Sequence, residues 1–455
     1  MSGLTRSQPR DAISHARSLR ALPLDLLGAS GDQPTVRMDL GETRILLRNL
    51  RASSQAASAR LADNAMAYLA TATGRWSHHE ARDVVVALHR ILTRSRFLKG
   101  SRSYFPVETA VTRCTPFVRS RRPITILLSG FPFKQHDNGL KAAGPWPDLA
   151  ELGALLRLKE LQDAFAALYP PGLRVVVLND GGYLRPRGSE EMLRYRRQLQ
   201  RYAQLVGLGD SVRFQDQSHF VAVLLGPQGW DRRERYRRTF RELISLLAAS
   251  PRSLAGARRA DQRLAEALPV TLLAGVPTFR DILSSLVYSV PVPVPAGADP
   301  RQWACEVLAW PDRYFEPDLS PDLASARREV VASAWQDTVN YLAACIADAA
   351  AGVVEHYPPH VRLATVASRQ GCCGFSYLGG SALLPWHGTG CLDGRGLLCA
   401  EFVVSLDHRG FLPVYSDLIG EAQPLLMVPG SRTVAAGGRR RVDPHLLAAA
   451  RLRSR

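Results

Sequence analysis

The chain has 455 residues, of which 46% are hydrophobic, and a formal net charge of +17. This length and composition predict a sizeable core, which we expect to be divided between two lobes. The sequence contains no run of about 18 uncharged apolar residues, so no membrane-spanning helix is predicted. Its N-terminus lacks an apolar core ahead of a small-residue cleavage site, so no signal peptide is predicted and a cytoplasmic location is expected.

The positive charge makes nucleic acid a partner to consider. Arginines cluster at 185–202 and 231–243, but both stretches have apolar residues at helical spacing and contain glutamates. Neither shows a nucleic-acid-binding motif, so the sequence favours solvated arginine faces over a nucleic-acid partner. The surplus charge would still attract small anionic substrates such as sugar phosphates.

The seven cysteines do not form a disulfide framework. Cys372, Cys373, Cys391 and Cys399 cluster, but they lack the short spacing that places two thiolates on one zinc ion. No metal site is therefore predicted.

The first predicted elements are helical. Residues 1–80 are rich in Ala, Arg and Ser, with a helical pattern at 44–72, and are interpreted as a peripheral helical extension. Residues 81–98 have the apolar spacing of a further helix. The run from Ile124 to Leu128 then ends at Ser129-Gly130, which is typical of a buried strand that leads into a loop.

A helix is predicted over 149–169, because Asp148 and Glu151 fit a capping box and Tyr169-Pro-Pro-Gly stops the helical pattern. A second buried strand follows at Val175 to Leu178. Strand, helix and strand in this order indicate a βαβ unit with parallel pairing.

Later elements complete the predicted fold. A strand is expected at 212–217, helices over 233–268 and 322–354, and a proline-rich connection at 290–300. Consecutive strands and turns are expected at 361–367, 379–390, 399–407 and 411–418. The predicted fold is α/β: a Rossmann-like parallel-sheet lobe (81–289), a second α/β lobe that completes the site (290–425), the helical N-terminal extension (1–80) and a basic tail (426–455).

Lysine is rare, because only four of the 58 basic residues are lysines: Lys99, Lys134, Lys141 and Lys159. A chain that uses arginine for plain charge can retain lysine where an amine, a removable proton or a compact cation is required. Codon bias with chance survivors is the alternative, and it is favoured for Lys99 and Lys159. Lys134 and Lys141 instead follow a buried strand, where a lysine can bind phosphate, act as an acid or base, or form a Schiff base.

The loops after the two predicted strands are expected to share one rim of the sheet, where ligands bind in parallel α/β folds. Lys134 and Asp180 would then lie within reach of each other. Asp180 precedes two glycines that allow close approach, which favours a functional role. Asn138-Gly139 requires a tight turn, and Asp148 is explained mainly by helix capping.

The segment GFPFKQHDNGLKAAGPWPDLAEL (130–152) resembles the motif of the pyoverdine/dityrosine biosynthesis family, the isocyanide synthases and their fungal dityrosine relatives. Shorter matches follow in the same order: YPPGLRVVVLNDGGYL (169–184), Arg362-Leu363 and Leu384 to Gly388. The resemblance covers about residues 85–425. One departure is that Ala364-Thr365-Val366-Ala367 stand where the family usually has Ser-Ile-His-Pro.

The resemblance implies conversion of an amino acid's α-amine to an isocyanide, with ribulose 5-phosphate as the one-carbon donor and no metal or organic cofactor. A downstream Fe(II)/2-oxoglutarate oxygenase of the same specialised pathway is an implied partner. The implied catalytic residues are Lys134, Asp180 and His387. The implied substrate-binding residues are Lys141, Asn138, Asp148, Arg362, Trp386 and Tyr415.

Several roles remain open at this point. Lys134 and Lys141 are acid/base or phosphate-binding groups, and Arg362 is a bidentate clamp for phosphate or carboxylate. His387 is a proton shuttle or a hydrogen-bonded turn residue. Because the departure at 364–367 removes a histidine, amino-acid N-formylation is the alternative reaction. A basic nucleic-acid-binding protein with a decayed site is the alternative from another class.

Overall fold

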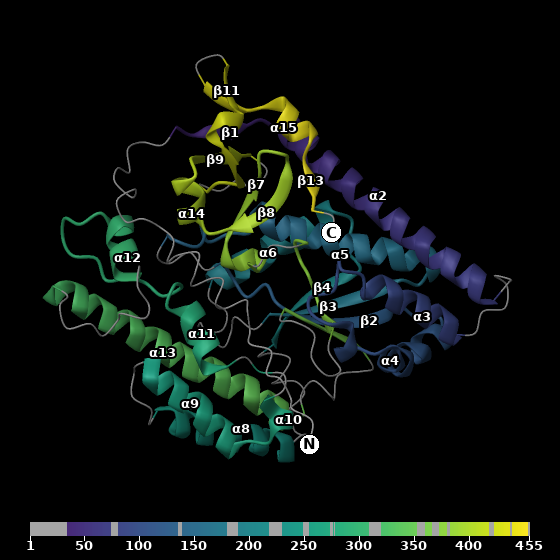
Figure 1. Ribbon diagram of the computed structural model, residues 1–455, viewed down its shortest axis with the longest axis horizontal. Helices are drawn as coiled ribbons and strands as arrows, with labels where there is room; N and C mark the ends of the chain where they lie inside the picture. The colour runs from purple at the N-terminus through teal and green to yellow at the C-terminus, as the bar shows by residue number, and fades with distance from the viewer. Residues whose placement is uncertain are drawn as a thin grey trace.

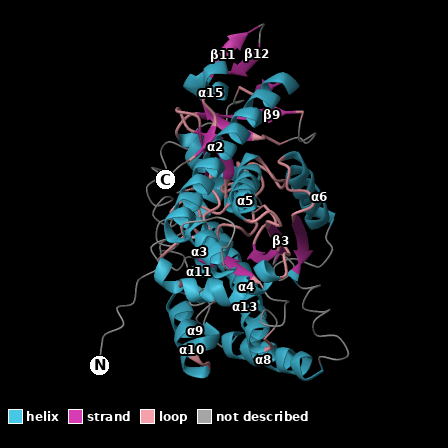
Figure 2. Cartoon of the chain, turned by 90° about the vertical axis from the view of Figure 1, so that its right-hand side faces the viewer, coloured by secondary structure: helices cyan, strands magenta, loops and turns pink. Residues whose placement is uncertain are grey.

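The computed structural model describes residues 34–73, 81–134, 139–179, 190–217, 230–248, 254–273, 276, 278–308, 320–352, 360–365, 373–379, 383–417, 423–436 and 439–453. Figures 1 and 2 show an eight-stranded sheet at one end of the molecule, a helical unit at the other, and a parallel sheet between them. Within those ranges, no helix combines the length and apolar character needed to cross a bilayer.

The middle sheet has five parallel strands in the order β4-β3-β2-β5-β6. Their bounds are β2 Ile124–Ser129, β3 Leu173–Asn179, β4 Val212–Asp216, β5 Val361–Ala364 and β6 Cys373–Gly374. The predicted strands and their parallel pairing are therefore confirmed, and so is the α/β class. The strand order reverses between β2 and β5, which makes the carboxyl ends of these two strands the switch point where ligands bind in such sheets.

Helix α5 (Leu149–Leu168) is the central element of the fold. It begins with the predicted capping box and is followed by Gly172, whose φ of 64° suits the turn into β3. Its sequence is apolar on nearly all sides, and most of its residues are buried. It packs on α2 (Leu40–Thr73), α3 (Ala81–Leu92) and both sheets, so it is an interior helix shared by the two sheets.

The eight-stranded sheet has the order β11-β12-β1-β9-β10-β7-β8-β13. Its strands are β1 Val36–Met38, β7 Thr389–Leu392, β8 Leu397–Glu401, β9 Phe411–Ser416, β10 Leu426–Pro429, β11 Thr433–Ala436, β12 Arg439–Val442 and β13 Arg451–Leu452. Helix α14 (Val403–His408) precedes β9, and helix α15 (Pro444–Ala448) precedes β13.

This sheet corrects three predictions. The basic tail predicted over 426–455 is wrong, because this segment supplies four strands whose Val428, Val442 and Leu452 are buried. The helical extension is not wholly peripheral, because β1 lies inside the sheet between β12 and β9. The segment 399–407 is a strand followed by a helix, α14, and not a strand throughout.

Helices precede the first strand of the parallel sheet and connect its later strands. They are α4 Val107–Arg119 before β2, α6 Glu190–Leu205 before β4, and, between β4 and β5, α8 Trp230–Ala248, α9 Leu254–Ala267, α10 Val270–Leu273, α11 Phe279–Leu286, α12 Pro300–Leu308 and α13 Pro321–Ala350. The last six form the helical unit (Figure 1), in which Phe279 packs on Trp335 at 4.6 Å between ring centroids. Leu283, Val290 and Val307 belong to one hydrophobic cluster, so the chain on both sides of the proline-rich connection shares a single core.

Gly390 of β7 allows the eight-stranded sheet to contact the start of α5. A Cβ atom at this position would lie 2.5 Å from the backbone nitrogen of Ala150, whereas a Cβ at Gly394 would meet no atom within 4 Å. We therefore expect Gly390→Ala to lower the free energy of unfolding by about 1–3 kcal/mol, through overpacking. Gly394→Ala is the matched control and should change it by less than about 0.5 kcal/mol. Urea denaturation measures both, and equal effects of the two changes would contradict this account.

Candidate active site

The chain leaves β2 at the switch point through an unusual turn. Phe131 has a φ of 54°, a left-handed conformation that costs free energy in a residue with a side chain. Its buried ring compensates by packing on Trp386 and Tyr377, at centroid distances of 5.0 and 5.6 Å. Asn179, at the end of β3, donates a hydrogen bond from Nδ2 to the carbonyl oxygen of Pro132 at 3.0 Å. A hydrogen bond therefore joins the segments that follow β2 and β3, as expected for two loops at the same edge of the sheet.

This turn places Lys134 in a buried cluster at the N-terminus of α5. The lysine side chain is 1% exposed, and its Nζ donates to Glu151 Oε1 and Oε2 at 2.9 and 2.8 Å. The same Nζ lies 3.1 Å from Asp148 Oδ2 and donates to the carbonyl oxygen of Pro385 at 3.0 Å. Lys134 therefore bridges the two residues of the capping box with a buried ammonium group.

Glu151 is the carboxylate on which this cluster is centred. Besides Lys134, it accepts hydrogen bonds from the Tyr195 hydroxyl at 3.1 Å and from the Asp148 backbone N–H at 2.9 Å. Burial raises the pKa of Glu151; the Lys134 ammonium opposes this increase and the Asp148 carboxylate adds to it. A carboxyl group whose pKa is raised by burial is a candidate general acid or base.

Asp148 links the cluster to the eight-stranded sheet. Its Oδ1 accepts the Ala150 N–H at 2.8 Å, which is the predicted helix cap, and also the Gly390 N–H at 3.1 Å. The side chain is thus both a cap and a partner of Lys134. Capping, the main role expected from the sequence, is confirmed.

Lys141 lies in a different environment, close to α11. Its Nζ donates to the carbonyl oxygen of Ser285 and to Ser289 Oγ, both at 2.7 Å, and the residue is 3% exposed. Burial lowers the pKa of Lys141 to about 7. Its amine therefore exists in both charged and neutral forms near neutral pH, and the neutral form is the one that accepts a proton or attacks a carbonyl.

The other predicted site residues are distributed around these lysines. Arg362, on β5, is half-buried and pairs in register with Leu127 of β2. Trp386 is buried against Phe131 and Tyr377, so it packs the turn that positions Lys134. His387 is half-buried, and its ring meets the Trp386 ring edge-on. Asn138 and Asp180 lie outside the described residues.

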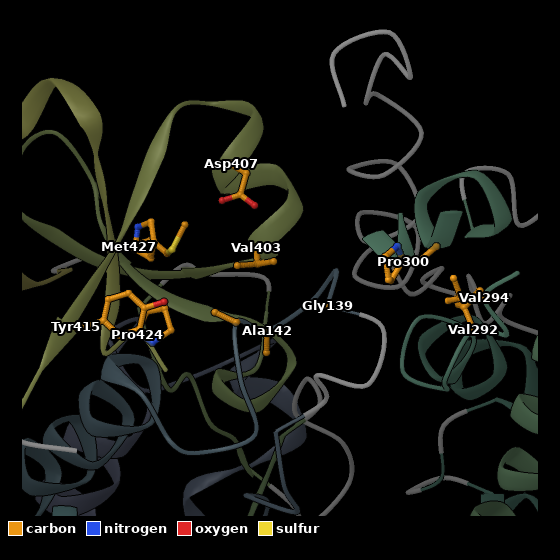
Figure 3. A pocket seen from close by; sticks show the side chains of 13 residues that line it. Gly139, Ala142, Val292, Val294, Pro300, Val403, Asp407, Tyr415, Pro424 and Met427 are labelled. Atoms are coloured by element: carbon orange, nitrogen blue, oxygen red, sulfur yellow. The ribbon is translucent and has the colours of Figure 1, made fainter. Parts of the chain in front are cut away.

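Tyr415 lines a separate pocket of about 470 Å³, next to the loop that carries Lys141 (Figure 3). The described residues that line the pocket come from five segments of the chain and are Gly139, Ala142, Ala143, Val292, Val294, Pro300, Ala304, Val403, Asp407, Pro413, Tyr415, Pro424 and Met427. Lys134, Asp148 and Glu151 do not line it. Among the predicted residues, the structure therefore brings Lys134, Asp148 and the Pro385–His387 turn together and places Tyr415 elsewhere.

Three residues of interest were not among the predicted site residues. In the sequence, Glu151 is identified only as part of the capping box. In the fold, the chain between Lys134 and Glu151 turns back, so that the two side chains form a hydrogen bond across a separation of 17 residues. Tyr195 lies in the arginine-rich segment 185–202, where the sequence indicates a helix and no site residue. Asp407 is part of no motif that the sequence shows, and most of its neighbours in the pocket come from other segments.

The fold and this cluster define an α/β protein with a buried acid–base group at the switch point of a parallel sheet. Residues 114–262, about a third of the chain, match the family model described as pyoverdine/dityrosine biosynthesis protein. This segment is therefore similar to that family, as its motifs indicate, and it contains Lys134, Lys141, Asp148 and Glu151.

The chain is also similar to known isonitrile and isocyanide synthases. It is 35% identical to the L-tyrosine isonitrile synthase of Xenorhabdus nematophila over 74 residues, which cover 16% of this chain and 22% of that protein. It is 40% identical to the isocyanide synthase-NRPS hybrid crmA of Aspergillus fumigatus over 65 residues, or 14% of this chain and 4% of that protein. The alignments thus span less than a quarter of either relative. Among solved structures, the PvcA protein of Pseudomonas aeruginosa aligns over 77% of this chain and 100% of its own, at 16% identity and a TM-score of 0.44.

Removing the Lys134 ammonium would leave two buried carboxylates without this counter-charge. We expect Lys134→Met to lower the free energy of unfolding by about 3–5 kcal/mol, and the double change Lys134→Met/Glu151→Gln to recover part of the loss. Lys159→Met is the control: Lys159 forms a partly exposed pair with Asp163, which is worth less than about 1 kcal/mol. Urea denaturation of the four proteins tests this expectation. A Lys134→Met protein as stable as the control would show that the buried pair does not stabilise the fold.

Lys141 predicts a specific dependence of stability on pH. In the unfolded chain this lysine keeps its proton up to its ordinary pKa of 10.5, whereas the folded protein releases it near 7. Between these values the unfolded state binds more protons, so the contribution of Lys141 to the unfolding free energy rises with pH, by up to about 1.4 kcal/mol per pH unit. Urea denaturation between pH 7 and 10 should therefore give a less positive slope for Lys141→Met than for the unchanged protein and for Lys159→Met. Identical slopes would show that the folded-state pKa of Lys141 is ordinary.

Proposed function

We propose that this protein is an isocyanide synthase that converts the α-amine of an amino acid to an isocyanide, with ribulose 5-phosphate as the one-carbon donor. The observation that carries the proposal is the buried Lys134–Asp148–Glu151 cluster, at the switch point of the parallel sheet and within the family segment. The similarity to isonitrile and isocyanide synthases supports the same reaction class. The product would enter specialised metabolism, where an Fe(II)/2-oxoglutarate oxygenase is the proposed next enzyme.

The chemistry of this reaction fits the two lysine environments. The amine of the amino acid condenses with the ketone of the sugar phosphate and water is lost. The later steps move protons and break the carbon–carbon bonds between the imine carbon and the sugar, so that this one carbon stays on nitrogen and the rest of the sugar phosphate leaves. Lys141 is the proposed base, since burial lowers its pKa to about 7 and makes the neutral amine available. Glu151 is the proposed proton carrier, because burial raises its pKa, and Lys134 holds this carboxyl group in place.

The remaining roles follow the position of each residue. Arg362 lies on β5, beside the strand that leads to Lys134, and is the proposed clamp for the phosphate or the carboxylate of a substrate. His387 follows Pro385, whose carbonyl oxygen binds Lys134, and is a proposed proton shuttle. Asp180 and Asn138 remain proposed ligands of the amine and the sugar.

A formamide is the second candidate product. Ala364 ends β5, and Ala364-Thr365 lie at the switch point beside the strand that leads to Lys134. The residues that depart from the family motif therefore begin at the candidate site, where a lost histidine would alter proton transfer. N-formylation of the amino acid differs from isocyanide formation by one water molecule, so the two products come from closely related pathways.

The direct test is to incubate the purified protein with ribulose 5-phosphate and a panel of amino acids, and to trap isocyanide with a tetrazine. An adduct is expected from at least one amino acid. No adduct from any of them, beside a positive L-tyrosine isonitrile synthase, would contradict the proposal. A product heavier by one water, seen by mass spectrometry before any isocyanide, would support N-formylation instead.

The lysine variants then test the assignment of the base. Lys141→Arg keeps a cation that does not release its proton, so kcat should fall by about 100-fold or more. Lys159→Arg is the matched control and should have the kcat of the unchanged protein, because Lys159 pairs with Asp163 on the surface of α5. Circular dichroism verifies that both variants are folded. A folded Lys141→Arg protein with ordinary kcat would remove Lys141 from the proton chemistry.

A further inference from the structure

The pocket beside the Lys141 loop lies between the eight-stranded sheet and the proline-rich connection of the helical unit. One wall is the face of the eight-stranded sheet that carries Pro413, Tyr415 and Met427. The opposite wall is the proline-rich connection with the start of α12, represented by Val292, Val294 and Pro300 (Figure 3). Its volume of about 470 Å³ lies within the range of small-molecule sites.

Successive side chains of β9 point to opposite faces of the eight-stranded sheet, and this alternation explains which of them line the pocket. Leu412, Val414 and Ser416 are buried, and Ser416 contacts Thr43 of α2 at 2.8 Å through its hydroxyl group. Pro413 and Tyr415 therefore point to the opposite face and are only half-buried, because the pocket lies in front of them.

The lining has the composition of a site for a largely apolar molecule. Most of its side chains are aliphatic, proline or methionine, while Gly139, Ala142, Ala143 and Ala304 are small enough to leave space between the walls. Among the described residues that line the pocket, Asp407 and Tyr415 have polar side chains, and they lie on the sheet side with Met427 (Figure 3). A carboxylate attracts a cationic amine, and a tyrosine hydroxyl can donate to a carboxylate.

From this arrangement we infer that the pocket binds an α-amino acid with a large apolar side chain: the ammonium group on Asp407, the carboxylate near Tyr415, and the side chain between the sheet and the proline-rich connection. The identity of this ligand as the amine substrate rests on the proposed function. The residues that set amino-acid specificity would then be those of the connection and of the Gly139–Ala143 loop.

The position of the pocket relative to the buried cluster suits this role. The Gly139–Ala143 loop continues from Lys134 towards α5, and the backbone N–H of Ala143 donates to Thr389 Oγ1 at 2.8 Å. The next residue, Gly390, donates to Asp148. The pocket and the acid–base cluster therefore share one loop and one strand start.

The test is calorimetric titration of the full chain with L-leucine, L-methionine and L-phenylalanine, with and without ribulose 5-phosphate. N-acetyl-L-leucine, which has no ammonium group, and L-glutamate are the comparison ligands. At least one apolar amino acid should bind, and the two comparison ligands should bind at least about tenfold more weakly, since each lacks one element of the match.

Two variants connect this binding to the pocket. Asp407→Asn should weaken binding about tenfold or more by removing the charge partner of the ammonium, and Ala143→Phe should weaken it similarly by filling the space. Asp163→Asn is the matched control, a partly exposed carboxylate on α5 that does not line the pocket, and it should bind like the unchanged protein. Melting temperatures verify that each variant is folded.

The outcomes separate this inference from the proposed function. Absence of binding under both conditions, or binding that neither pocket variant weakens, would overturn the inference. Isocyanide formation with the same amino-acid KM in Asp407→Asn would overturn it too, while leaving the proposed function intact. Binding that depends on Asp407 and Ala143, in a protein that makes neither isocyanide nor formamide, would support the pocket and contradict the proposed reaction.

Discussion

The ion pair between Lys134 and the capping box of α5 is the interaction on which the rest of the structure depends. It joins the strand exit of β2, the first turn of α5, Tyr195 of α6 and the Pro385–His387 turn in one buried network. A buried charged pair has a high desolvation cost, so it stabilises a fold only when nearly every polar atom has a partner. The need for a partner at each polar atom of the pair constrains the geometry of each element that donates to it or accepts from it. The same need explains why the strained turn at Phe131, which leads to Lys134, is retained.

Helix α5 extends this constraint to the whole molecule. Because it is buried on nearly all sides, its position sets the positions of both sheets at once. The loop between β2 and α5 consequently has little freedom, although it carries both lysines of the candidate site. The two lysines nevertheless have opposite surroundings: Lys134 is surrounded by carboxylates, and Lys141 donates to a backbone carbonyl and a hydroxyl. One short loop thus supplies a lysine that pairs with two carboxylates and a second lysine whose pKa is lowered by burial.

The sequence predicts those parts of this arrangement that depend on local patterns. The apolar runs of β2 and β3, and the Asp148–Glu151 cap of α5, are contained in short segments, and all were predicted correctly. Strands β1 and β10 to β13 were missed because they are short, and their burial comes from partners far away in the chain. Glu151 was overlooked as a site residue because capping already accounted for it. The pocket could not be predicted, since five separate segments form its walls and no one of them is distinctive alone.

The position of β1 has a consequence for how the protein folds. Its Val36 pairs with Val414 on one side and Arg440 on the other, and the neighbouring contact between Thr43 and Ser416 spans 373 residues of the chain. Contacts between such distant residues are slow to form, because the long intervening chain must first become ordered. During synthesis β1 appears long before β9 and β12, the two strands with which it pairs. Until then its apolar side chains have no sheet to join, which gives chaperones a defined segment to protect.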